Sequence, residues 1–122
     1  MTGSRSYPPS ARLRRSSEIR AMFRSDRRSC GPLDVFLRPA QAAGPRVGIV
    51  VPKHGRTIVE RNRLKRRLRE ILRTQWLPGE RGRVAAEGGG RDLLVRVRPA
   101  AYAAGFEELA TALRTCLAPA RR

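Results

Sequence analysis

Residues 60–73 of this 122-residue chain combine a row of apolar side chains with a high density of positive charge. Seven of the fourteen residues are Arg or Lys. In an α-helix, at about 100° per residue, Leu64, Leu68 and Ile71 share one stripe. The opposite face carries Asn62, Lys65, Arg66, Arg69 and Arg73. Like charges this close repel one another, so the pattern predicts a helix with a hydrophobic core beneath it and an anionic partner above it.

The composition of the whole chain supports an anionic partner. The sequence has 27 Lys and Arg residues against 10 Asp and Glu, a formal net charge of +17. Hydrophobic residues make up 40% of it, which is enough for a folded core. A compact domain with this charge repels itself unless a polyanion neutralises it. Nucleic acid is the first candidate, and an anionic membrane surface is the second.

Hydrophobic periodicity and turn residues predict six elements. In chain order these are a helix at 17–24, strands at 33–38 and 46–51, a helix at 58–76, a strand at 91–98 and a helix at 105–117. Residues 26–32 are predicted to be a loop, and Pro78-Gly79 is predicted to end the long helix before a loop at 78–90. The side chains predicted to face the core are Leu33, Val35, Leu37, Leu93, Val95, Val97, Phe106, Leu109, Ala110 and Leu113.

These elements predict a single α+β domain, a small mixed sheet with helices packed on it in the order α-β-β-α-β-α. The first two strands are close in sequence, which favours an antiparallel hairpin between them. The long helix then connects two strands as a βαβ crossover. Residues 1–11 are predicted to be a flexible basic arm, residues 12–118 the folded domain, and residues 119–122 a basic tail.

The residues that carry chemistry are few. Cys30, Cys116 and a single His54 cannot form a zinc or catalytic cluster, and the acidic residues are scattered. We therefore expect no metal site and no catalytic residue in the protein. No apolar stretch is long enough for a membrane span or a signal peptide, which predicts a cytoplasmic protein. We expect the two cysteines to be reduced thiols that pack as small hydrophobic side chains.

Four segments resemble a known family. The string Arg61-Asn62-Arg63-Leu64-Lys65-Arg66, followed by Arg69-Glu70, resembles the characteristic motif of the bacterial ribonuclease P protein component. Residues 46–53 are similar to its second strand and the basic turn that follows, and residues 92–99 to its third strand. Residues 13–23 are similar to its N-terminal basic-aromatic helix. The resemblance implies a left-handed βαβ crossover.

The resemblance also implies a function. Proteins of this family bind a catalytic RNA, the ribonuclease P RNA, and assist it in removing the 5′ leader of precursor tRNA. The protein would form a 1:1 complex with the RNA and bind no cofactor itself, while magnesium would act with the RNA subunit. The residues implied to contact the RNA subunit are Lys53, Arg61, Asn62, Arg63, Lys65, Arg66 and Arg69. Those implied to bind the single-stranded leader are Ile19, Phe23, Val35 and Phe36.

Phe36 has polar neighbours, Asp34 and Arg38, on its predicted strand face, so we expect it to be partly exposed and able to stack on a base. Core packing is the alternative role for Phe23. At the level of the whole protein, the alternative is an RNA-binding structural protein of ribosomal type. A membrane-surface helix is a weaker alternative, because the core needs the apolar stripe.

Overall fold

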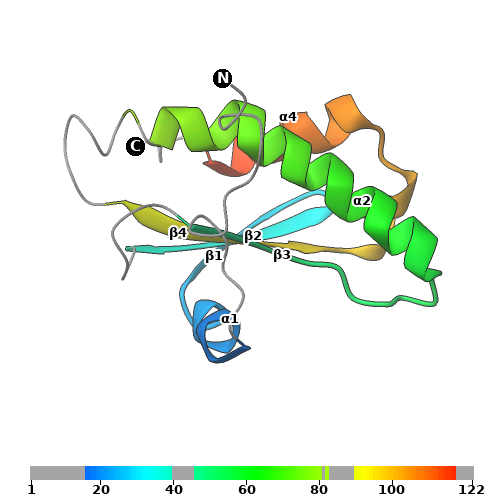
Figure 1. The fold of residues 1–122 in the computed structure, drawn as a ribbon, viewed down its shortest axis with the longest axis horizontal. Coiled ribbons are helices and arrows are strands. Elements are labelled where there is room, and N and C mark those ends of the chain that lie inside the picture. The colour runs from blue at the N-terminus through cyan, green and yellow to red at the C-terminus, as the bar shows by residue number, and fades with distance from the viewer. Residues whose placement is uncertain (1–15, 40–45, 81, 83–89, 118–122) are drawn as a thin grey trace, which may run out of the picture.

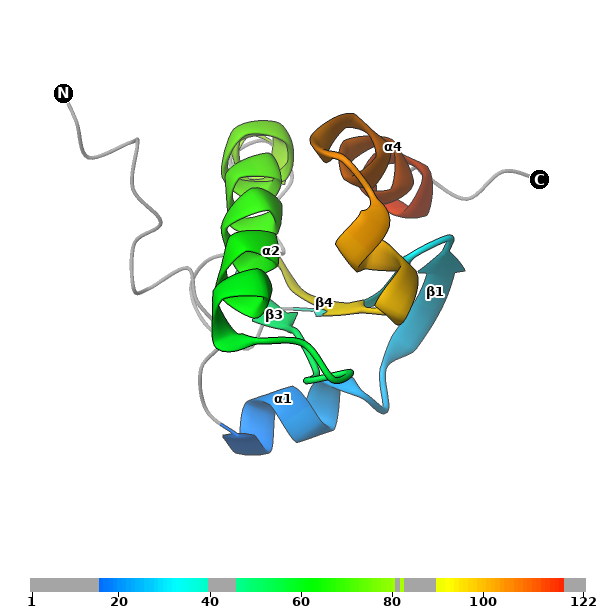
Figure 2. The same cartoon turned by 90° about the vertical axis from the view of Figure 1, so that its right-hand side faces the viewer.

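The computed structural model describes residues 16–39, 46–80, 82 and 90–117. The predicted N-terminal arm and C-terminal tail lie outside this part of the chain. A sheet separates two layers of helices, with α2 and α4 side by side on one face and α1 on the other (Figures 1 and 2). The elements are α1 (Ser16–Met22), β1 (Asp26–Cys30), β2 (Leu33–Pro39), β3 (Arg46–Val50), α2 (Ile58–Ile71), η3 (Leu72–Trp76), β4 (Arg91–Val97), η4 (Pro99–Ala103) and α4 (Phe106–Leu117). The predicted α+β class and single mixed sheet are confirmed.

The sheet has the strand order β1-β2-β4-β3. Strand β2 is antiparallel to both β1 and β4, and β3 is parallel to β4. Two predictions are therefore wrong: residues 26–30 form a strand rather than a loop, and the hairpin joins β1 to β2 rather than β2 to β3. Strand β1 lies at the sheet edge, where its polar side chains remain largely exposed and show no hydrophobic alternation. Its turn to β2 contains Gly31 at φ 58°, a left-handed conformation that glycine adopts without strain.

Strand β3, helix α2 and strand β4 form the βαβ crossover. In Figure 2, α2 lies above the sheet, and the chain moves from β3 on the left to β4 on its right. In Figure 1, β3 runs toward the end of the sheet where α2 begins. Together these views trace a left-handed crossover, the exception to the usual right-handed rule.

The long helix contains a change of register. Residues Leu72–Trp76 form a π-helical turn directly after α2, and residues 77–80 remain helical. The prediction that Pro78 ends the helix is therefore wrong. Proline lacks an N–H, and the π-helical turn directly before Pro78 is where the backbone hydrogen bonds change register, which lets the helix continue through the proline.

The main core lies between the sheet and the α2–α4 layer. Leu33, Val35, Leu37, Leu93, Val95 and Val97 from the strands meet Leu64, Leu68, Ile71, Leu109, Ala110 and Leu113 from the helices. The predicted core faces of both strands and of the long helix are confirmed. Phe106 is the exception: it is 37% exposed, because it is the first residue of α4 and lies at the end of the layer.

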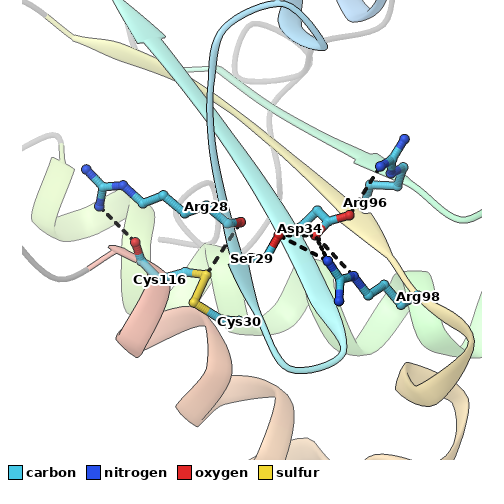
Figure 3. Close-up of polar contacts among 7 residues, drawn as sticks. All are labelled: Arg28, Ser29, Cys30, Asp34, Arg96, Arg98 and Cys116. Carbon is cyan, nitrogen blue, oxygen red and sulfur yellow. Dashed lines mark hydrogen bonds and ion pairs between the residues drawn. A yellow bond between two sulfur atoms is a disulfide. The ribbon is translucent and has the colours of Figure 1, made fainter.

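Cys30 and Cys116 form a disulfide across 86 positions of sequence, so the prediction of two free thiols is wrong. The bond joins edge strand β1 to the last turn of α4 (Figure 3). Beside it, the Arg28 guanidinium donates a 2.8 Å hydrogen bond to the Cys116 carbonyl oxygen. A loop at residues 26–32 does not predict Cys30 beside the C-terminal helix, whereas strand β1 brings it there.

Candidate nucleic-acid interface

A capping box fixes the start of α2. The Thr57 hydroxyl accepts a 3.1 Å hydrogen bond from the Glu60 N–H, and the Thr57 N–H donates a 2.9 Å bond to the Glu60 carboxylate. This backbone hydrogen bond is the main reason why the pKa of Glu60 lies below its ordinary value. Two of the orphan N–H groups at the helix start are thereby satisfied.

We call the cations on the outer face of α2, together with Asn62, the basic ridge. Its exposed members are Asn62, Arg63, Arg66 and Arg69, and its half-buried members are Arg61 and Lys65. Within the described residues, none of these six side chains has an ion pair, and Glu70 pairs with Arg73 at 2.6 Å instead. The ridge is therefore an uncompensated positive surface on a helix that is anchored through its opposite side.

Arg61 differs from the rest of the basic ridge. Its Nε and Nη2 atoms donate bonds of 3.3 and 3.2 Å to the Val51 carbonyl oxygen, which ties α2 to the loop after β3. Lys53 in that loop is exposed. The structure thus places the residues predicted to bind an RNA subunit on one helix and the loop leading into it.

A second, smaller hydrophobic cluster lies on the other face of the sheet, beneath α1. It consists of Met22, Phe36 and Leu94, with Ile19 and Val50 packed against it. Phe23 lies at its margin and is 37% exposed. Its ring contacts that of Phe36 edge to face, with centroids 5.2 Å apart.

Two of the residues predicted to bind a leader are not available at this surface. Phe36 is only 2% exposed, so the prediction of partial exposure is wrong. Its polar strand neighbours are themselves covered, because Asp34 and Arg38 form ion pairs with other side chains on this face. Val35 points to the opposite side of the sheet, where it is fully buried in the main core.

The structure adds an arginine that the sequence analysis did not select. The Arg96 guanidinium lies 5.2 Å from the Phe23 ring centroid and 5.7 Å from that of Phe36. Both distances suit cation–π contacts. Arg96 follows Leu94 by two positions on β4, so strand alternation alone could have placed it on the α1 face.

Ion pairs attach α1 to the sheet beside this cluster. Arg46 on β3 contacts Glu18 of α1 at 2.8 Å and the buried Asp92 at 3.1 Å, while Arg38 contacts Asp92 at 3.4 Å. The hydrogen bond to Asp92 is the main reason why the pKa of Arg46 is raised. The short helix α1 thus has a polar attachment as well as an apolar one.

Asp34 joins strands β1, β2 and β4 through hydrogen bonds (Figure 3). Its carboxylate accepts bonds from the Ser29 hydroxyl at 2.7 Å, from Arg98 at 2.8 Å and from Arg96 at 3.2 Å. Burial alone would raise the pKa of Asp34, but these bonds together hold it below its ordinary value. Asp34 therefore fixes Arg96 in its position next to Phe23.

The lowered pKa predicts a loss of stability in acid. Asp34 stabilises the fold above its unfolded pKa of about 4, and this contribution disappears as the pH falls through the lower folded value. We expect Asp34→Asn to be less stable than wild type at pH 7, and its melting temperature to fall less steeply than that of wild type between about pH 5 and pH 2. Thermal melts followed by circular dichroism across this pH range test the prediction, and parallel curves for the two proteins would contradict it.

In the described ranges there is no cluster of three or more His, Cys, Asp or Glu residues that could hold a metal ion. Among the helices described, none is long and apolar enough to cross a membrane. Two features point to a ligand. One is the basic ridge on α2, and the other is the pair of Phe23 and Arg96 beside α1, on the other face of the sheet.

An α+β domain with a strongly basic helix facing outward defines a class of small RNA-binding proteins. The ribonuclease P family model matches residues 7–121, so the chain belongs to the ribonuclease P protein family. Members of this family are protein subunits of ribonuclease P, the endoribonuclease that processes tRNA.

Individual relatives agree with this assignment. The ribonuclease P protein component of Acidothermus cellulolyticus is 39% identical over 106 residues, covering 84% of this chain and 82% of the relative. That of Mycobacterium avium is 37% identical over 116 residues, covering 90% and 91%. In fold, the chain is similar to the RNase P protein of Thermotoga maritima, with a TM-score of 0.66, 24% identity and coverage of 87% and 94%. The Staphylococcus aureus protein gives a TM-score of 0.69 at 19% identity, with coverage of 88% and 92%.

Proposed function

We propose that the protein binds two RNAs on opposite faces of its sheet. The basic ridge and Lys53 bind the ribonuclease P RNA in a 1:1 complex, and the α1 face binds the 5′ leader of precursor tRNA. The RNA subunit with its magnesium ions hydrolyses the phosphodiester, and the protein supplies positive charge and substrate affinity. We propose that it acts in the cytoplasm.

The uncompensated charge of the basic ridge is the observation that carries this proposal. Exposed arginines without acidic partners repel one another, and they gain most when phosphates replace the counterions around them. Arginine also donates two hydrogen bonds to one phosphate group at the same time. Since the apolar stripe of α2 is buried in the main core, the ridge can bind RNA without any rearrangement of the fold.

Phe23 is the side chain best suited to a single-stranded leader. It is partly exposed, Phe36 supports its ring from below, and Arg96 adds a positive charge at the same place. Stacking of bases on an aromatic ring has little sequence preference, which suits a leader of variable sequence. Ile19 contributes by packing α1 onto the cluster that supports Phe23.

Charge reversal on the basic ridge tests the first surface. We expect Arg66→Glu with Arg69→Glu to abolish RNA-subunit binding at physiological salt while the fold remains intact, because both side chains are exposed. Binding titrations with the ribonuclease P RNA, together with circular dichroism, measure both effects. In the single variant Arg66→Gln, loss of one phosphate contact should lower the salt slope of log affinity by about 0.7 to 0.9.

A cleavage assay with the same proteins distinguishes a ribonuclease P subunit from a general RNA-binding protein. The wild-type chain should restore cleavage of precursor tRNA by the RNA subunit at low magnesium, and the double variant should not. Binding without restored cleavage would favour the structural RNA-binding alternative, and loss of the helical spectrum in the variant would contradict the assignment of Arg66 and Arg69 to a solvent-facing ridge.

Phe23→Ala tests the second surface. We expect the holoenzyme to bind precursor tRNA more weakly by about 1 to 3 kcal/mol, the worth of one stacked base, and mature tRNA unchanged. Only the precursor carries the single strand, so the comparison isolates the leader. Phe106→Ala is a matched control, since Phe106 is equally exposed but lies in α4 on the other layer. An equal loss for precursor and mature tRNA would overturn the assignment.

A further inference from the structure

Tyr102 of η4 holds the loop that leads into α2. Its hydroxyl donates a 3.3 Å hydrogen bond to the Pro52 carbonyl oxygen, and the Arg56 guanidinium lies 4.7 Å from its ring centroid. His54, at φ 46° in the left-handed region, meets the same ring edge to face at 6.5 Å. One half-buried aromatic side chain thus fixes a loop whose tip is conformationally strained.

A small cavity opens between Tyr102 and the inner edge of the basic ridge. It is lined by Glu60, Arg63, Leu64, Arg67 and Tyr102, and its volume is about 90 Å³. This is well above the roughly 10 to 15 Å³ that one enclosed water molecule needs. It is far below the ~300 Å³ at which pockets for whole small molecules begin. The size suits a single small group.

The charges around the cavity favour an anion. Arg63 is exposed and has no ion pair within the described residues, and Arg67 uses one nitrogen to donate a 3.3 Å bond to the Ala104 carbonyl oxygen. The opposing charge is Glu60, whose carboxylate is already engaged by Thr57 and, at 3.3 Å, by Arg56. Arg63 and Arg67 therefore line the cavity with unused N–H groups. The negative charge of Glu60 is already balanced by Arg56.

We propose that this cavity is a subsite for one phosphate of the RNA subunit's backbone, bound between Arg63 and Arg67 and bordered by Tyr102. The subsite rests on the proposed RNA-binding function and extends its surface from α2 to η4. Arg67 and Tyr102 become RNA-contacting residues, although Arg67 lies off the outer face of the helix. The hydrogen bond from the Tyr102 hydroxyl to the Pro52 carbonyl oxygen holds this side of the subsite in place before RNA arrives.

The decisive experiment compares Arg67→Gln with Arg114→Gln. Both remove one positive charge, but Arg114 lies on α4, bonded to Gln75 and Thr111. Affinity of the full chain for the ribonuclease P RNA is measured from low to moderate salt, with thermal melts as a check on the fold. For Arg67→Gln we expect about a tenfold loss of affinity or more, as for one charge-assisted hydrogen bond. Its salt slope should fall by about 0.7 to 0.9, while Arg114→Gln matches wild type.

Each outcome bears on the proposal. Equal salt slopes for Arg67→Gln, Arg114→Gln and wild type overturn the subsite, even if Arg66→Glu with Arg69→Glu still abolishes binding. If that ridge variant binds normally as well, the proposed function itself fails. Arginine modification of the wild-type protein by phenylglyoxal covers the case in which Arg67→Gln does not fold. RNA should protect Arg67 but not Arg114, and unchanged reactivity of Arg67 overturns the subsite.

Discussion

Reduction of the Cys30–Cys116 disulfide is expected to lower the free energy of unfolding by about 2 to 5 kcal/mol. The bond spans 86 positions of sequence, so it encloses most of the described domain and restricts the unfolded chain strongly. It also holds edge strand β1 to α4, which packs on the other side of the main core. Urea unfolding with and without dithiothreitol, after free thiols have been counted, measures the effect.

The double variant Cys30→Ala with Cys116→Ala provides the control. Its free energy of unfolding should be about that of the reduced wild-type protein, and dithiothreitol should not change it. If the oxidised wild-type protein contains no free thiol and reduction still leaves its unfolding curve unchanged, the bond contributes nothing to folding. RNA binding by the basic ridge should survive reduction, because α2 is anchored to the sheet by its own apolar stripe.

Phe36→Ala is expected to destabilise the fold by about 3 to 5 kcal/mol, the cost of truncating a buried phenylalanine. Phe36 is 2% exposed and packs with Met22 and Leu94 in the cluster beneath α1. The variant leaves a cavity that the short helix α1 cannot fill without moving. Urea unfolding measures the loss of stability. Amide hydrogen exchange should become faster in α1 before it does so in the other elements.

Phe36→Ala is compared with Phe106→Ala for stability and with the wild-type protein for affinity toward precursor tRNA. Phe106→Ala removes an equally large but partly exposed ring, so it should cost far less stability. Leader affinity should also fall in Phe36→Ala, because the ring of Phe23 loses its support. A variant that stays as stable as wild type and yet binds precursor tRNA more weakly would return Phe36 to the role of a direct stacking residue.

The amphipathic helix at 58–76 could be predicted from local pattern alone. Its period and its basic face are encoded within one segment, and burying the stripe of Leu64, Leu68 and Ile71 exposes the cations on the opposite face. The family motif lies in the same segment, so the fold class and the family could also be predicted. The burial of Leu64 and Leu68 in the structure agrees with that local pattern.

The aromatic surface on the other face could be predicted only in part. Strand alternation placed Phe36 correctly on the α1 face, but it could not reveal that α1 covers that ring. Val35 is a different case, since its alternation with Phe36 already places it on the opposite face, and its burial in the main core excludes it from the leader surface. Exposure depends on which element packs above a strand, and local sequence does not contain that information.

Strand partners and long-range bonds were decided by the tertiary structure. A polar edge strand such as β1 carries no hydrophobic alternation, so residues 26–30 read as a loop, and the true hairpin and the Cys30–Cys116 bond were missed together. The cavity beside Tyr102 likewise forms only where α2 and η4 come together. The sequence by itself determined the basic helix and the main core stripes, because these depend on spacings of three, four and two residues. It also determined the family, because the motif at residues 61–70 resembles that of known members. Which strand pairs with which, which ring is covered and where distant cations meet depend on contacts between segments far apart in the chain, and only the folded structure specifies them.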